Sequence, residues 1–124
     1  MAAEGLKERI NEARPAIHIV AEDGADRGTL AYMLEGIEEE GIPADMAFEP
    51  AAGPGAAAIA FRAASESRLG VGIGITAREA VIHFDKLSVG NPLFRESLPG
   101  KADDIRVMGS NAARLVKRMP FKGL

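Results

Sequence analysis

The segment Leu69–Asp85, with the sequence LGVGIGITAREAVIHFD, decides the fold class predicted for this chain. In its first half, apolar side chains alternate strictly with Gly70, Gly72 and Gly74, which is typical of a β-strand whose two faces differ. Glycine weakens a strand, so three glycines in register indicate that another backbone, a helix or a ligand approaches that face closely. A second strand, Ala80–Asp85, follows a short turn, and the two strands predict a hairpin.

Upstream of this hairpin, strands and helices alternate. Apolar patterning predicts strands at Ala16–Ala21 and Asp45–Glu49 and helices at Asp26–Glu40 and Ala56–Ser65. Alternating strands and helices that lead to one hairpin are typical of an α/β domain. We therefore expect a single three-layer α/β/α domain with a mixed sheet of four to five strands.

The last third of the chain is less regular. A loop is predicted over Lys86–Asp103 and a short final strand at Ile105–Met108. The last helix is predicted at Asn111–Met119, with Ser110 as its N-cap and Pro120 as its end.

Length and composition indicate one soluble, intracellular domain. The chain has 124 residues, 47% of them hydrophobic and 27% charged, which suits a single core. A formal net charge of −3 argues against binding to nucleic acid or to an anionic membrane. There is no cysteine and no apolar run near the ~20 residues that span a bilayer. We expect residues 1–15 to be a lead-in, helical over residues 3–13, and residues 16–124 to form the domain.

The usual signatures of catalysis and cofactor binding are absent from the sequence. The glycines of the strand recur every second residue and lead into another strand, unlike the turn-and-helix pattern of a dinucleotide site. His18 and His83 fall in strands outside any metal-binding array, and we expect each to be a half-buried, hydrogen-bonded histidine. No serine lies in a nucleophile elbow. We therefore predict no catalytic residue and no cofactor bound by this chain alone. A small enzyme that uses the histidines remains an alternative.

Three consecutive glutamates, Glu38, Glu39 and Glu40, close the helix predicted at Asp26–Glu40. Acidic side chains are unfavourable there because the C-terminal end of a helix carries about half a negative charge. Either the glutamates form a solvated acidic end, or a cation or basic partner offsets their charge. Helical periodicity places Glu39, together with Glu35, opposite the apolar stripe, so both should point away from the core.

A basic edge is predicted on the last helix, at Arg114, Lys117 and Arg118. Two charged edges without catalytic apparatus indicate recognition, so these three residues and Glu35, Glu38 and Glu39 are the predicted interface residues. One carboxylate cannot hold magnesium alone, because octahedral oxygen coordination needs several ligands. Glu39 could complete a metal site that is shared with a partner.

Three blocks, Leu34–Pro43, Val71–Phe94 and Asn111–Phe121, resemble the small subunit of the diol/glycerol dehydratase reactivating factor. The resemblance extends from about Ala16 to Leu124, with the blocks in the family's order. That family is related to the medium subunit of cobalamin-dependent dehydratases, which has a similar glutamate-rich helix. The resemblance implies the dehydratase medium-subunit fold. A medium, or assembly, subunit of the dehydratase itself is therefore the alternative function.

The resemblance implies a chaperone-like role without catalysis. In the family, this subunit pairs with a large actin-like ATPase subunit that carries ATP or ADP, and the complex releases damaged cobalamin from inactivated dehydratase. The central glutamate of the three-glutamate run helps to hold magnesium at the subunit contact, and Glu39 matches it here. A cytoplasmic location follows, and the lead-in could serve as a tag for a bacterial microcompartment.

Overall fold

A mixed five-stranded sheet organises the computed structural model, which describes residues 14–123. In chain order the elements are β1 (Ile17–Glu22), α2 (Arg27–Glu39), β2 (Ala44–Glu49), α3 (Ala56–Glu66), β3 (Val71–Ile75), β4 (Glu79–Phe84), β5 (Phe94–Ser97) and α4 (Ala102–Lys117). The strand order is β2-β1-β3-β4-β5. The strands β2, β1 and β3 are parallel, whereas β4 and β5 are antiparallel to their neighbours.

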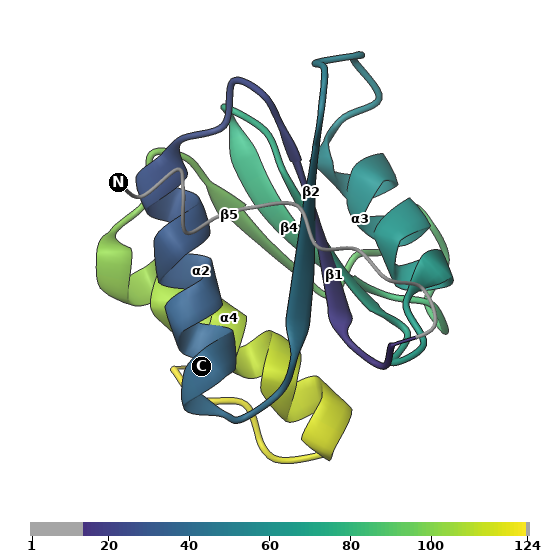
Figure 1. The fold of residues 1–124 in the computed structure, drawn as a ribbon, viewed down its shortest axis with the longest axis vertical. Helices are drawn as coiled ribbons and strands as arrows, with labels where there is room; N and C mark the ends of the chain where they lie inside the picture. Colours follow the sequence, from purple (N-terminus) through teal and green to yellow (C-terminus); the bar gives the residue numbers. More distant parts are fainter. Residues whose placement is uncertain (1–13, 124) are drawn as a thin grey trace.

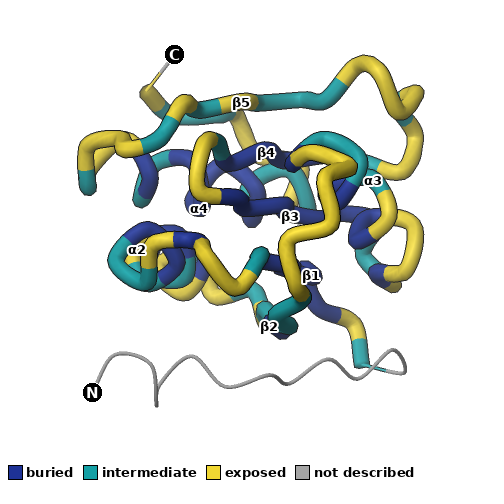
Figure 2. The backbone as a smooth tube through the Cα atoms, turned by 90° about the horizontal axis from the view of Figure 1, so that it is seen from above, coloured by how far each residue is buried: buried dark blue, intermediate teal, exposed yellow. Residues whose placement is uncertain are grey.

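The sheet lies between two helical layers, as the sequence predicted. Helices α2 and α4 cover one face and α3 covers the other (Figure 1). Burial is concentrated in β1, β3 and β4, the inner strands of the sheet (Figure 2). The hairpin of β3 and β4 is also confirmed. The lead-in helix expected over residues 3–13 lies outside the described residues.

The glycines of β3 allow α3 to pack directly on the sheet. A Cβ atom added to Gly72 would overlap the backbone of Ala60 and Ala64, and one added to Gly74 would overlap the backbone of Ala56. The close approach predicted from the glycine pattern is therefore confirmed, and a helix occupies that face.

A second pair of glycines brings α2 and α4 together on the other face. A Cβ atom on Gly36 would overlap the Arg106 carbonyl, and one on Gly109 would overlap the Met33 carbonyl. The helices therefore touch along their backbones, above a core that includes Ile37. As a result, the glutamate-rich end of α2 lies against the C-terminal half of α4.

The strand and the N-cap expected in the last third of the chain are both wrong. The final strand predicted at Ile105–Met108 belongs to α4, which begins nine residues earlier than expected because Ile105, Met108 and Ala112 recur at helical spacing and all lie in the core. Ser110 is consequently a buried residue inside this helix and not its cap.

The loop predicted over residues 86–103 contains a strand, β5, which pairs with β4. This strand has only four residues, every second one is exposed, and it lies at the edge of the sheet. Short, charged edge strands near prolines carry a weak sequence signal, because little of their surface is buried. Within residues 14–123, none of the helices has the length and apolar character needed to cross a membrane.

Candidate functional site

The three glutamates at the end of α2 lie in different environments. The helix starts at the cap residue Asp26, whose Oδ2 accepts a hydrogen bond from the Thr29 amide at 2.9 Å. It ends at Glu39, and Glu40 takes the C-cap position. Glu38 and Glu39 are exposed, whereas the side chain of Glu40 is only 8% exposed. Only the first two are therefore accessible to a partner.

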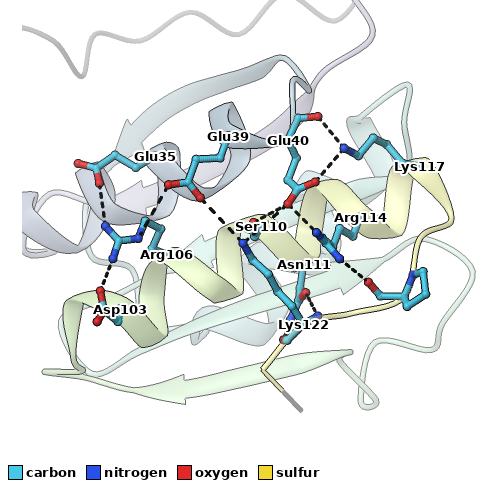
Figure 3. A network of polar contacts seen from close by, with 11 residues as sticks. Glu35, Glu39, Glu40, Asp103, Arg106, Ser110, Asn111, Arg114, Lys117 and Lys122 are labelled. Carbon is cyan, nitrogen blue, oxygen red and sulfur yellow. Dashed lines mark hydrogen bonds and ion pairs between the residues drawn. The ribbon is translucent and has the colours of Figure 1, made fainter.

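Glu40 is held by three side chains of α4 (Figure 3). Its Oε2 accepts hydrogen bonds from Ser110 Oγ at 2.9 Å and from Arg114 Nε at 3.0 Å. Lys117 Nζ donates to both Glu40 Oε1 and the Glu40 backbone carbonyl, each at 2.8 Å. The hydrogen bonds from Lys117, Arg114 and Ser110 lower the pKa of the Glu40 carboxyl from 4.5 to about 2. The cation that offsets the acidic helix end thus comes from the chain itself.

The acidic and basic edges, separate in the sequence, meet in one contact between α2 and α4. Arg114 and Lys117 are both engaged with Glu40. Arg118, the third predicted basic residue, is exposed at the end of α4 with a left-handed backbone φ of 59°. Arg114 and Lys117 therefore contribute to this region mainly by fixing the position of Glu40.

Glu39 is the accessible carboxylate of this contact. It is 50% exposed, with Arg106 Nε 4.0 Å from its Oε2 and Lys122 Nζ 4.0 Å from its Oε1. Both distances exceed hydrogen-bonding range, and within residues 14–123 the carboxylate accepts no hydrogen bond from another side chain. Glu35, on the same face of α2, is 51% exposed and lies 3.7 Å from Arg106 Nη1. The Glu39 oxygens therefore remain open to an additional ligand.

The residues present fit part of a metal site. No group of three or more potential ligand residues occurs in the described part of the chain. Magnesium takes six oxygen ligands and often keeps several waters. Glu39, with its open oxygens, can supply one of these ligands, and water or another chain would have to supply the rest.

Two residues of this contact, Arg106 and Lys122, are not among the residues predicted from the sequence. The strand predicted at Ile105–Met108 includes Arg106, although Arg106, Ser110 and Arg114 recur every four residues, which indicates one face of a helix. That periodicity could have identified Arg106. Lys122 lies beyond the last helix, and no local pattern indicates that the chain turns back there.

The two histidines are more deeply buried than expected. His18 is 1% exposed and His83 is 0% exposed, so the expectation of half-buried rings is wrong. His83 Nε2 lies 3.2 Å from the Val89 carbonyl and its ring packs edge-on against Phe61. His18 lies beside Asp45 in the register of β1 and β2. Because both histidines are covered by the fold, a substrate could not reach either ring.

Comparison with known proteins identifies the class. Residues 14–122 match the family model of the dehydratase medium subunit, and the chain belongs to this family. Its relatives include the diol dehydratase-reactivating factor small subunit of Klebsiella michiganensis, which is 40% identical over 114 residues, covering 92% of this chain and 89% of the relative. The propanediol dehydratase-reactivating factor small subunit of Citrobacter freundii is also 40% identical, over 90% of this chain and 94% of the relative.

Solved structures agree with these relatives. A diol dehydratase-reactivating factor complexed with ADP and Mg²⁺ superposes with a TM-score of 0.82 at 40% identity, covering 88% of this chain and 98% of the other. A glycerol dehydratase reactivase superposes with a TM-score of 0.82 at 30% identity, covering 88% and 97%. The predicted resemblance and fold are thus confirmed. These relatives support a reactivating-factor small subunit over a dehydratase medium subunit.

Proposed function

We propose that this chain is the non-catalytic small subunit of a factor that reactivates a diol or glycerol dehydratase. The observation that carries the proposal is the 40% identity to a reactivating-factor small subunit over 92% of the chain. In this proposal the partner is a large, actin-like ATPase subunit that binds ATP and ADP. The complex releases damaged cobalamin from the inactivated dehydratase, so that intact coenzyme can bind.

The exposed acidic face of α2 is the proposed contact with the large subunit. Glu35, Glu38 and Glu39 are all exposed on this helix. We assign Glu39 as the one ligand that this chain supplies to a magnesium ion at the contact, because its oxygens are open and its neighbours Arg106 and Lys122 stay at 4.0 Å. Glu39 would hold the ion from this side, and a bound ion would supply electrostatic attraction between this chain and the large subunit.

The charges on α4 support this face in different ways. Arg114 and Lys117 hold Glu40 and thereby fix the end of α2. Arg118 is exposed and is free to meet an acidic group of the large subunit. The proposed site of action is the cytoplasm, with or without a microcompartment shell around the dehydratase.

A reactivation assay tests the proposal. Dehydratase that retains damaged cobalamin is incubated with ATP, magnesium and fresh coenzyme, and aldehyde formation is measured. Activity should return only when both this chain and the large subunit are present. Recovery with the large subunit alone would contradict the proposed role. The medium-subunit alternative instead predicts stable assembly of this chain with the dehydratase large subunit and diol turnover by that complex.

A further inference from the structure

A hollow lies at the open end of the hairpin of β3 and β4, where the last turn of α4 meets the sheet. Its volume is about 240 Å³, below the roughly 300–1,000 Å³ of small-molecule sites, so it suits a single side chain. The apolar part of its lining consists of Leu69, Val71, Phe84, Leu115 and Val116. All of these except Val71 are only partly buried, so apolar surface remains open in the hollow.

Two arginines complete the described lining, Arg68 from the turn before β3 and Arg118 from the end of α4. Both are exposed, and the described lining contains no acidic residue. The chain as a whole has a formal net charge of −3, so this positive rim is a local feature. Guanidinium groups donate paired hydrogen bonds to carboxylates. An apolar floor with such a rim fits an apolar side chain that stands next to a carboxylate.

Arg118 holds a backbone conformation that favours glycine. Its φ of 59° is left-handed, and within residues 14–123 it is the only non-glycine residue with a positive φ. Helices that end in this conformation usually have glycine or asparagine there, because a Cβ atom is strained. The cap itself is made by the backbone, since the Arg118 amide donates to the Leu115 carbonyl at 3.2 Å. The cap does not require an arginine side chain, and the strain therefore indicates a role in recognition.

We propose that this hollow receives an apolar side chain and an adjacent carboxylate of the large subunit, with Arg118 as the residue that binds the carboxylate. The inference rests on the proposed function. The position of the hollow supports this partner. Lys117, the residue before Arg118, donates to Glu40 at the end of α2, so the hollow borders the proposed acidic contact (Figure 3). The large subunit thus meets both signs of charge, which fixes its orientation.

Calorimetry with the purified large subunit and the full-length chain tests this inference. Arg118→Gln should weaken binding by about five- to tenfold, because a charge-assisted hydrogen bond is lost. The loss should shrink at high salt, since the rim is exposed. Val116→Phe fills the hollow without changing the charge and should also weaken binding.

Arg78→Gln is the matched control, because Arg78 is an exposed cation in the turn at the closed end of the hairpin. The five residues of β3 separate this turn from the hollow by about 17 Å, which exceeds a Debye length of about 8 Å. Its affinity for the large subunit should change by less than about twofold.

Arg118→Gly separates recognition from folding. Glycine adopts the left-handed conformation without strain, so this variant should unfold at a temperature about 3 °C higher than the unmodified chain. It should nevertheless bind the large subunit as weakly as Arg118→Gln does. A lower unfolding temperature would overturn the inference, because the arginine would then serve the fold.

Unchanged affinity of Arg118→Gln overturns the inference, as does full affinity of Val116→Phe. Sedimentation of the isolated chain checks a different occupant. A dimer that Arg118→Gln dissociates would assign the hollow to a second copy of this chain and would also overturn the inference. If the unmodified chain does not bind the large subunit, the proposed function fails together with the inference. Undiminished binding by the variants contradicts the inference alone.

Discussion

At the scale of single residues, three adjacent glutamates differ because the helix ends between them. Glu39 is the last residue of α2 and is half exposed, whereas Glu40 lies at the C-cap and its side chain contacts α4. Lys117 donates to both the carboxylate and the backbone carbonyl of Glu40. One lysine thus offsets a side-chain charge and the negative end of a helix dipole together.

Glu39 is predicted to matter for association and not for folding. Glu39→Gln should weaken magnesium-dependent binding to the large subunit by about tenfold or more, because a charged ligand is lost. Calorimetry in magnesium buffer measures this, and thermal unfolding should be unchanged. Glu66→Gln is the control, since Glu66 is exposed at the end of α3, on the other face of the sheet. Equal binding by both variants would remove Glu39 from the proposed site.

Glu40 is predicted to stabilise the fold in a pH-dependent way. Its pKa is about 2 in the folded chain against 4.5 ordinarily, so its contribution is full above pH 4.5 and is lost as the pH falls towards 2. Glu40→Gln should therefore be less stable than the unmodified chain at pH 7, and the difference should shrink by pH 3. Urea unfolding at both pH values measures it. A difference of equal size at pH 3 and pH 7 would contradict the assignment.

At the scale of elements, glycine sets how closely the layers pack. The backbone of α3 rests on Gly72 and Gly74 of β3, and α2 meets α4 at Gly36 and Gly109. In each pair of elements a missing side chain lets two backbones touch. The second contact also sets which residues of α4 reach the end of α2.

Gly72→Ala should destabilise the chain, because the new methyl group must displace α3. The expected loss is about 1–3 kcal/mol in the free energy of unfolding. Gly24→Ala is the matched control, since a Cβ atom at Gly24 meets nothing within 4 Å. Urea unfolding of both variants measures the effect. If Gly72→Ala and Gly24→Ala have the same urea midpoint of unfolding, α3 does not pack on β3 as described.

At the scale of the whole molecule, the fold brings the charges of α2 and α4 together in one contact. The described chain matches the dehydratase medium-subunit family, yet its relatives at about 40% identity are reactivating-factor small subunits. The same architecture therefore serves in two related assemblies, and function depends on what the surface presents. In the proposed role, the exposed acidic face of α2 and Arg118 are the parts that meet the large subunit.

The sequence by itself determined the layered α/β architecture, because alternating strands, amphipathic helices and the glycine pattern of β3 are local periodicities. It also identified Glu39 as outward-facing, since helical phase alone sets that direction. Only the second half of helix α4 was predicted, although Ile105, Met108 and Ala112 recur at helical spacing from its first half onward. Strand β5 was not predicted, because a short strand at the edge of the sheet buries little surface.

Only the tertiary structure decided how the charges are paired. The contacts of Glu40 with Ser110, Arg114 and Lys117 join residues at least 70 positions apart in sequence. The approach of Lys122 to Glu39 depends on a tail that turns back over a helix. Such pairs form because α2 and α4 pack closely at Gly36. Local sequence propensity does not determine how closely two helices pack.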